Sequence, residues 1–381
     1  MKDIIYRTYK KGDDKQLADL FNKAFQMNGA SFIRTSKSWN WRYVQSPSFE
    51  PQMIQIAEDI NSKKIIGALY VNLVEHVNFN GKKLLKGEIN DVSCLPEYTR
   101  RGIAKSLMIR AIDYMKLKDC DVSILSADFH GFPRKKIYLK YGFEDIDREH
   151  VFIWLPQVFQ LMREFPLFWI LFPIVIPFSY IPRLIYRVFM KKRSLTSSLS
   201  YEIVRNENHF QYMRALNQIM SKNYEGFYPY TKTKYFWARI NVPTQKDQPT
   251  YVVIKKNGGI IGGAEFSCVN IHSFKFKFKF KLGIVHEIFL DKSAFESNED
   301  IQNGYSYLID KLLNAAFKRS VGVLILFISS FENDLYYALR KINLIKFKGA
   351  SIMIKRLKDK VQIGKLAKPL YIPTHISFSL P

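Results

Sequence analysis

Residues 87–143 read GEINDVSCLPEYTRRGIAKSLMIRAIDYMKLKDCDVSILSADFHGFPRKKIYLKYGF, and this stretch decides the fold. An apolar strand is predicted over residues 89–95, and an amphipathic helix follows the turn that contains Gly102. A second apolar strand is predicted over residues 122–125, and a basic helix closes the unit. This order places the unpaired N–H groups of a helix N-terminus at the end of a buried strand, an arrangement that binds phosphate.

The composition indicates a folded protein with an excess of positive charge. Of the 381 residues, 47% are hydrophobic and 15% are aromatic, which is enough to bury sizeable cores and suits two domains. The formal net charge is +24, and most of the excess falls in residues 156–381. This imbalance predicts an anionic partner, such as a membrane surface, a phosphorylated substrate or RNA, or else a solvated basic surface without one.

The cysteines and the first residues bear on the cellular compartment. Cys94, Cys120 and Cys268 form neither a disulfide framework nor a paired metal motif, and the histidines show no ligand spacing. The charged start, MKDIIYRTYKKGDD, does not have the apolar core of a secretory signal. We therefore expect a cytoplasmic protein without a bound metal.

The pattern of the first half returns after residue 200. Tryptophan segments at residues 41–43 and 237–239 each have a proline six positions after the tryptophan, and a strand, a turn and Ile-Ile-Gly then follow in both copies. Residues 297–304, SNEDIQNG, replace the arginine-glycine turn with acidic side chains, which would repel phosphate. We therefore predict an active domain at 1–155, a linker at 156–199, a degenerate second domain at 200–357 and an extended tail at 358–381.

The predicted linker contains an unusual apolar stretch. Residues 165–182 carry no charge, and a basic cluster follows at 183–193. The length is near that of a transmembrane helix, but repeated prolines would break its hydrogen-bond ladder. Three interpretations stay open: a spanning helix, a segment in the membrane interface with its basic cluster on lipid headgroups, and a connector packed on protein. The second would place residues 165–193 on an anionic membrane surface, at the inner face of the membrane.

Residues 274–281 alternate strictly between phenylalanine and lysine, FKFKFKFK. A period of two predicts a strand with one aromatic face and one lysine face. The strand is either half-buried with solvated lysines or a basic ridge that contacts an anionic surface.

Residues 1–155 resemble the GNAT superfamily of acyl-CoA N-acyltransferases, and residues 200–357 resemble a degenerate second copy. The resemblance rests on residues 88–143, with the Arg-Arg-Gly-Ile-Ala turn and the closing Tyr-x-x-x-Gly-Phe. The segments at 39–47 and 130–133 further resemble tandem proteins of the enhanced-intracellular-survival type and transferases found with surface-polysaccharide genes. The resemblance implies an α+β fold of two tandem units, each with a mixed, mostly antiparallel sheet and helices on both faces.

For the cosubstrate, the resemblance implies that backbone N–H groups of residues 101–105 hold the pyrophosphate of acetyl-CoA. The family motif is Arg/Gln-x-x-Gly-x-Gly/Ala; Gly102 and Ala104 match it, but Thr99 stands at its first position. Pantetheine would insert between residues 93–95 and 124–126, where a backbone N–H near Cys94 or Leu95 would polarise the thioester. The residues expected to contact the cosubstrate are Ser93, Cys94, Leu95, Arg100, Arg101, Gly102, Ile103, Ala104, Lys105 and Arg134.

The resemblance also implies a base for the attacking amine and an acid for the departing thiolate. Glu88 stands at the position of the strand-borne glutamate of the family, and we expect it to act as the base, directly or through a water. Asp91, placed on the opposite face by alternation, is a second candidate, and His130 is more simply a loop histidine. Tyr138 would protonate the thiolate. The competing interpretations are solvent-facing carboxylates for Glu88 and Asp91 and an ordinary core residue for Tyr138.

Together these features predict transfer of an acetyl group from acetyl-CoA to a primary amine by direct attack in a ternary complex. The basic second half favours an anionic or membrane-associated acceptor, such as an amino sugar or a lipid-linked glycan precursor, and no specific nucleic acid. Two alternatives stay open. One is an aminoacyl-tRNA-dependent transferase of tandem GNAT-like fold, and the other is a non-catalytic membrane-surface protein with a vestigial acyl-CoA pocket.

Overall fold

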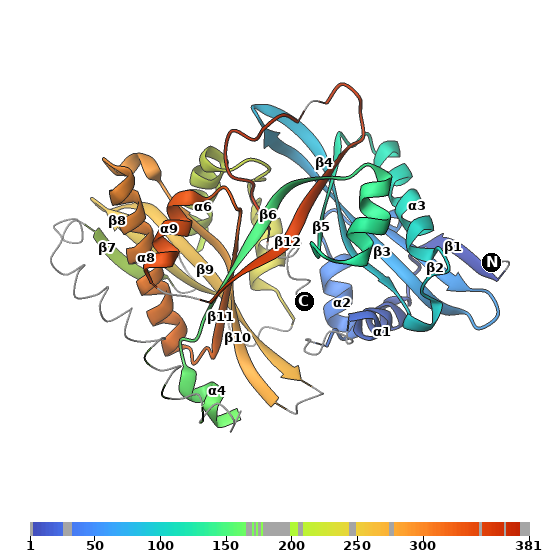
Figure 1. Ribbon diagram of the computed structural model, residues 1–381, viewed down its shortest axis with the longest axis horizontal. Coiled ribbons are helices and arrows are strands. Elements are labelled where there is room, and N and C mark those ends of the chain that lie inside the picture. Colours follow the sequence, from blue (N-terminus) through green and yellow to red (C-terminus); the bar gives the residue numbers. More distant parts are fainter. Residues whose placement is uncertain are drawn as a thin grey trace.

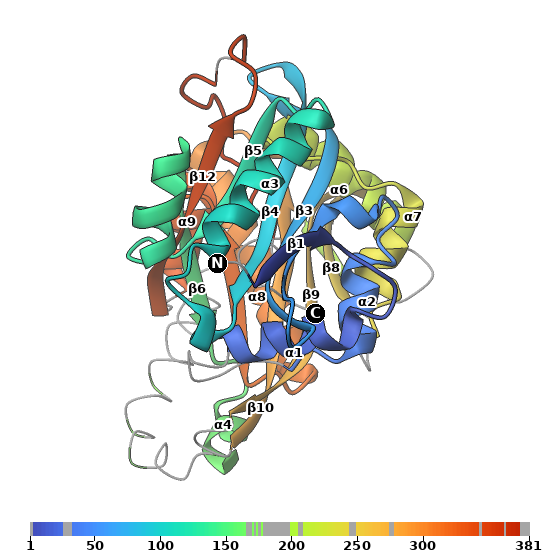
Figure 2. The same ribbon diagram turned by 90° about the vertical axis from the view of Figure 1, so that its right-hand side faces the viewer.

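A computed structural model describes residues 3–25, 33–164, 199–204, 209–243, 249–273, 278–342, 345–361 and 363–373, together with positions 170, 173 and 177. Within these residues, twelve strands form one continuous sheet flanked by helices (Figures 1 and 2). The strands of the first half are β1 (Ile4–Thr8), β2 (Ile54–Asp59), β3 (Lys64–Phe79), β4 (Lys82–Cys94), β5 (Val122–Ala127) and β6 (Glu144–Trp154). Those of the second half are β7 (Leu199–Val204), β8 (Thr250–Lys256), β9 (Gly259–Ser273), β10 (Phe278–Leu290), β11 (Val323–Ile328) and β12 (Ile345–Arg356). The α-helices are α1 (Asp14–Phe25), α2 (Ser36–Tyr43), α3 (Ile103–Leu117), α4 (Val158–Glu164), α6 (His209–Asn223), α7 (Lys232–Tyr235), α8 (Asn298–Lys318) and α9 (Asn333–Lys341).

The order of the strands is palindromic. Across the sheet it runs β1-β2-β3-β4-β5-β12-β6-β11-β10-β9-β8-β7, so it is the same from either edge when β1 to β6 are matched with β7 to β12. Two pairings, β4 with β5 and β10 with β11, are parallel, and the other pairings of described strands are antiparallel. The predicted mixed, mostly antiparallel sheet is therefore confirmed.

The last strands of the two halves are exchanged. β12 lies between β5 and β6, where Ser351 pairs with Ala127, and β6 lies between β12 and β11, where Ile153 pairs with Ile325. Each half therefore completes its part of the sheet with the last strand of the other half. The sequence predicts one sheet for each half, and the structure corrects this to a single sheet. The exchange leaves no exposed edge at the centre, because N–H and C=O groups on both sides of β6 and β12 are paired.

Helices cover both faces of the sheet, as predicted. In β3, Tyr70 packs on Tyr43 of α2 with ring centroids 4.4 Å apart, whereas Gly67 faces Ile103 of α3. Successive strand residues point to opposite faces, so α2 and α3 lie on opposite sides of β3. A Cβ on Gly67 would lie 2.7 Å from Cγ2 of Ile103, so only glycine permits this close approach of strand and helix.

Two predicted local features have different outcomes. The turn expected at Gly81 joins β3 to β4, and Asn80 and Gly81 have φ angles of 50° and 78°, as two-residue hairpin turns require. The strand predicted over residues 274–281 is described only from Phe278, which pairs with Ser273. Residues 274–277 lie outside the described residues.

The predicted C-terminal tail returns to the centre of the molecule. The Tyr371 backbone N–H donates to the Glu225 carbonyl at 2.8 Å, and the Tyr371 hydroxyl donates to the Glu287 carboxylate at 2.9 Å. The Tyr371 ring lies edge-on to Phe227 with centroids 4.9 Å apart. Leu370, Tyr371 and Ile372 are therefore buried in a core to which both halves contribute, and residues 374–381 lie outside the described residues.

Little of the predicted linker can be compared with the structure. Helix α4 begins shortly after residue 155, whereas almost all of residues 165–198 lies outside the described residues. Among the helices in the described ranges, none is both long enough and apolar enough to cross a membrane.

Two tryptophans join the halves across the molecule. The indole N–H of Trp41 donates to the carbonyl of Trp237 at 3.2 Å, and the indole N–H of Trp237 donates to the carbonyl of Trp41 at 2.9 Å. Their ring centroids lie 5.5 Å apart. The residues that mark the predicted repeat in the sequence therefore meet each other where the two halves join.

Replacing either tryptophan by phenylalanine should weaken this contact. Trp41→Phe and Trp237→Phe each remove one indole hydrogen bond but keep an aromatic ring, so each should lower the free energy of unfolding by about 1 kcal/mol. Urea unfolding of both single variants and the double variant measures the effect as a double-mutant cycle. Because the rings are in contact, the two losses should not add. Unchanged unfolding midpoints in both single variants would contradict a bridging role.

Candidate active site

The parallel strands β4 and β5 separate part-way along their length. They pair from Lys86 with Val122 to Ile89 with Leu125. Beyond this point β4 continues to Cys94 and β5 to Ala127 without pairing to each other. The opening lies where the sequence predicts the pantetheine cleft, although Leu125 is still paired to β4.

Helix α3 begins close to the end of β4. Gly102 precedes its first residue with a φ of 77°, and no side chain caps the helix. A Cβ at Gly102 would meet no atom within 4 Å, so glycine is required here by the backbone conformation and not by packing. The predicted phosphate contacts Arg100, Arg101 and Lys105 are all exposed around this turn. An uncapped helix start with cations beside it suits a pyrophosphate.

The predicted contacts at residues 93–95 are directed largely towards β3. The Ser93 hydroxyl donates to the Ala68 carbonyl at 3.3 Å, and the Leu95 N–H donates to the Ile66 carbonyl at 2.9 Å. Cys94 is half-buried, and burial raises the pKa of its thiol to about 11. The Leu95 N–H is therefore used within the sheet, which corrects the expectation that it polarises a thioester.

A β-bulge interrupts β4 at the opening. Between the pairs Asn90–Tyr70 and Ser93–Ala68, β4 contains one residue more than β3, and Asp91 has a φ of 50°. The extra residue breaks the strict alternation of side chains. The prediction that Asp91 lies on the face opposite Glu88 assumed strict alternation between these two residues and beyond, and the bulge at Asp91 interrupts it.

The Asp91 carboxylate lies in a buried cationic cluster. Arg34 donates to it at 2.6 Å, and Nε of Arg42 lies 3.7 Å away. Arg34 also donates to the Tyr43 hydroxyl at 2.7 Å. Both arginines favour the ionised carboxylate, so Asp91 is better suited to be their counter-charge than to accept a proton.

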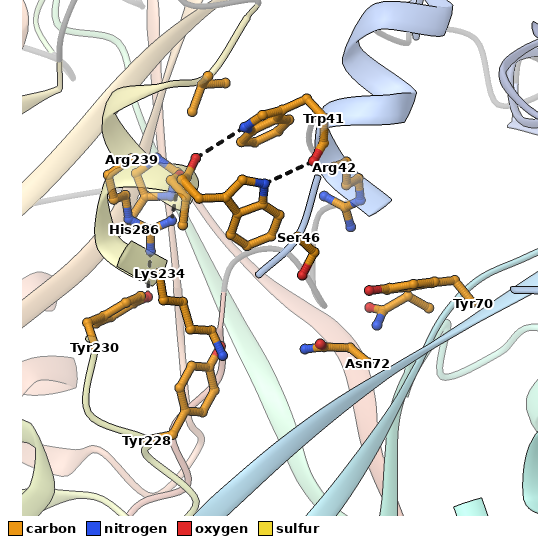
Figure 3. Close-up of a pocket in the computed structure, with 14 residues that line it drawn as sticks. Trp41, Arg42, Ser46, Tyr70, Asn72, Tyr228, Tyr230, Lys234, Arg239 and His286 are labelled. Carbon is orange, nitrogen blue, oxygen red and sulfur yellow. Dashed lines mark hydrogen bonds between the residues drawn. The ribbon is translucent and has the colours of Figure 1, made fainter. Parts of the chain in front are cut away.

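A pocket of about 820 Å³, part of it open to solvent, lies between the two halves (Figure 3). The first half lines it with Trp41, Arg42, Ser46, Tyr70, Asn72 and Asn90. The second half lines it with Tyr228, Tyr230, Lys234, Trp237, Ala238, Arg239, Val242 and His286. Because Asn90 immediately precedes the β-bulge, the pocket reaches the point where β4 and β5 separate.

Glu88 lies immediately behind the wall of this pocket. Its side chain is fully buried, not solvent-facing, and the carboxylate lies 2.7 Å from the Lys86 ammonium. It also accepts a hydrogen bond of 2.9 Å from the amide of Asn72, which lines the pocket. The Asn72 amide therefore links Glu88 to the lining of the pocket.

The remaining predicted residues lie on the segment after β5. Tyr138 ends the π-helical turn Arg134–Tyr138 and is buried in the core of the first half, where burial raises the pKa of its hydroxyl to about 12. It therefore keeps its proton at neutral pH. Arg134 forms an ion pair with Asp145 of β6, so its charge is already compensated within the protein. His130 is exposed in the loop, as the simpler interpretation expects.

The second half contains a charge cluster similar to that around Asp91. Arg239 donates to the Tyr230 hydroxyl at 2.8 Å and to the Glu287 carboxylate at 2.9 Å, and its Nε lies 3.3 Å from the Glu265 carboxylate. Trp41 and Trp237 are 196 residues apart. The same spacing of 196 residues separates Arg34 from Tyr230, Tyr43 from Arg239 and Asp91 from Glu287. The arginine and the tyrosine have changed places, and the carboxylate follows a β-bulge in β10.

Sequence reasoning missed the contribution of the second half to the pocket. Tyr228, Lys234 and His286 line it, although none belongs to a motif that carries chemistry. The available signal was indirect, since Lys234 lies three residues before the repeated Trp237.

Comparison with known proteins identifies the chemistry of the first half. Residues 5–146 match the family model of the acetyltransferase (GNAT) domain. The chain contains a GNAT acetyltransferase domain. An uncharacterized N-acetyltransferase, YafP of Escherichia coli, is 24% identical over 153 residues, which are 40% of this chain and 88% of the relative. These matches make the chain an acyl-CoA N-acyltransferase.

Solved structures share the fold over almost the whole chain. N-myristoyltransferase of Saccharomyces cerevisiae with bound myristoyl-CoA superposes with a TM-score of 0.66 at 11% identity, over 98% of this chain and 90% of that protein. A GCN5-related N-acetyltransferase from Anabaena variabilis gives a TM-score of 0.55 at 14% identity, over 93% and 73% of the two chains. The arrangement of both halves is therefore one that known N-acyltransferase structures also have.

The buried cluster around Arg239 should make stability depend on pH. Burial raises the pKa of Glu265 from 4.5 to about 8, while Arg239 opposes the shift. The folded state therefore binds a proton that the unfolded state has lost, and the free energy of unfolding should fall as the pH rises from about 4.5 to 8. Glu265→Gln should flatten this fall in pH-dependent urea unfolding, whereas Glu202→Gln, at a partly exposed carboxylate, should not. An identical pH profile in Glu265→Gln and the native protein would contradict the assignment.

Proposed function

We propose that this protein transfers an acetyl group from acetyl-CoA to a primary amine by direct attack in a ternary complex. The observation that carries the proposal is the separation of β4 from β5 beside the uncapped start of α3. A thioester arm placed between the strands would reach the β-bulge, next to which Asn90 lines the pocket between the halves. The acceptor amine would approach from that pocket, as an amino sugar, a glycan precursor or a similar anionic or membrane-associated molecule.

The proposed roles follow from where the side chains lie. The first-turn N–H groups of α3, with Arg100 and Arg101, would hold the pyrophosphate. Glu88 would accept the proton of the amine through a water, since it is buried behind the pocket wall, and the Asn72 amide would hold the Glu88 carboxylate in place. Tyr138, which keeps its proton at neutral pH, would donate it to the departing thiolate.

We also propose that the second half is a degenerate copy of the first that does not bind acyl-CoA. Its strand order mirrors the first half, and β10 has a bulge as β4 does. However, the helix that corresponds to α3 begins differently: Ser297 caps α8, and Glu299 and Asp300 occupy its first turn. The cap satisfies an N–H group, and the carboxylates repel a phosphate.

Binding of the cosubstrate can be tested at Gly102 with a matched pair of variants. Gly102→Ala and Gly102→Glu impose the same unfavourable φ, and a Cβ at this position meets no atom within 4 Å, but only the second variant adds a negative charge at the phosphate site. Thermal-shift titration with acetyl-CoA and myristoyl-CoA should show affinity at least about tenfold weaker in Gly102→Glu than in Gly102→Ala. Absence of any shift with the native protein would overturn the proposal. Equal affinities in the two variants would place the pyrophosphate elsewhere.

The role of Glu88 can be separated from its ion pair. Glu88→Gln removes the base but also leaves the Lys86 ammonium buried without its carboxylate, whereas Lys86→Met with Glu88→Gln restores neutrality. If Glu88 relays the proton, both should lose about 10²- to 10⁴-fold in kcat. The measurement is release of coenzyme A thiol with the most active amine from an amino-sugar screen. Recovery of activity in the double variant would show that Glu88 only balances Lys86.

A further inference from the structure

The pocket between the halves has an unusual balance of charge. Arg42, Lys234, Arg239 and His286 line it, and no carboxylate does so among the described residues. Its walls are otherwise aromatic rings and the amides of Asn72 and Asn90. A molecule that enters this pocket therefore meets cationic groups and aromatic faces.

Lys234 differs from the two arginines in its contacts. Arg42 and Arg239 have carboxylates beside them, at Asp91 and at Glu265 and Glu287. Within the described part of the chain, the Lys234 ammonium has an aromatic contact, the Tyr228 ring with its centroid 4.1 Å away, and no ion pair. Figure 3 shows its side chain extending from the α7 segment along Tyr228, on the side of the pocket where Asn72 projects from β3.

A second ammonium lies close to the first. The Lys86 ammonium is 5.2 Å from the centroid of the same Tyr228 ring and 2.7 Å from Glu88. Among the described residues, the ion pairs of these two lysines involve a single carboxylate, that of Glu88, which contacts Lys86. The local charge balance is positive, and a bound oxyanion would neutralise it.

We propose that this pocket binds an acceptor that carries a phosphate or carboxylate group beside its primary amine, and that Lys234 binds that oxyanion. The proposal rests on the proposed function and names the substrate class for it. The amine would lie towards Asn90 and the β-bulge, and the oxyanion towards Lys234. The aromatic walls formed by Trp41, Trp237 and Tyr70 suit the face of a sugar ring between these ends. The second half of the chain would then set acceptor specificity for chemistry carried out by the first.

The titration of Lys234 supports a charge role near neutral pH. Burial lowers the pKa of Lys234 to about 8; Glu88 opposes this shift and Lys86 adds to it. Lys234 is therefore mostly protonated at pH 7 and mostly neutral at pH 9. The other basic side chains that line the pocket, Arg42, Arg239 and His286, are the same in the variants compared below.

The test compares Lys234→Met and Lys234→Arg with Lys232→Met as the matched control. Lys232 lies on the same short helix but is exposed, and its ammonium lies 5.0 Å from the Phe210 ring, outside the pocket lining. Calorimetric titration uses glucosamine 6-phosphate and glucosaminic acid as the phosphate and carboxylate probes, and glucosamine as the reference that has the amine but no oxyanion. Acetyl-CoA binding is measured in parallel on every variant.

We expect one anionic probe to bind the native protein, Lys232→Met and Lys234→Arg, and to bind Lys234→Met about 10- to 100-fold more weakly, because a charge-assisted hydrogen bond is lost. Glucosamine should bind equally to all four proteins. Affinity for the anionic probe should fall between pH 7 and 9 in the native protein more steeply than in Lys234→Arg. Which probe binds distinguishes a phosphate from a carboxylate acceptor.

Two results would overturn the inference. One is binding of neither anionic probe to a native protein that still binds acetyl-CoA, and the other is equal binding of the anionic probe to Lys234→Met and Lys232→Met. Both leave the proposed acetyl transfer intact, because acetyl-CoA binding is read separately. Loss of acetyl-CoA binding in the native protein would instead remove the proposed function itself.

Discussion

The exchange of β6 and β12 holds the two halves in one arrangement. Both strands lie in the middle of the sheet, and each pairs with strands of the opposite half. The backbone hydrogen bonds of this region therefore form only when both halves are folded together. Because the halves are held in this relation, the repeated tryptophans meet and the pocket lies between them. Groups from both halves therefore face one pocket without the domain closure that hinged proteins need.

Buried charges give the pocket its chemical character. Each wall is supported by an ionic cluster, around Asp91 in the first half and around Glu287 in the second. Such clusters are costly to bury unless they are well compensated, and here tyrosine hydroxyls take part: Tyr43 accepts a hydrogen bond from Arg34, and Tyr230 donates one to Glu287. The arginines are thereby held in place, and the lysine pair on Tyr228 carries the less compensated charge.

The sequence predicted the order of the elements well, but it predicted poorly the features that depend on pairing between strands. The order of strand, glycine turn, helix and strand in the first half is present, and Gly102 stands at the start of α3 as expected. The prediction for Asp91 assumed that side chains alternate strictly between the two faces of the strand, and the β-bulge breaks that alternation. The free N–H expected at Leu95 is bonded to Ile66. Both misjudgements have one cause, because a bulge and a backbone pairing depend on the partner strand and not on the local pattern.

The sequence by itself determined the order of strand, glycine turn, helix and strand in the first half, since glycine, proline and apolar periodicity act through local backbone preferences. The acyltransferase interpretation of this unit came from its resemblance to a known family. The sequence also indicated the repeat, because Trp41 and Trp237 stand in similar surroundings. Only the tertiary structure decided that the halves share one sheet, that the C-terminal segment enters the core, and that Lys234 reaches the site. These features depend on contacts between residues far apart in the chain, for which a single sequence contains no periodic signal.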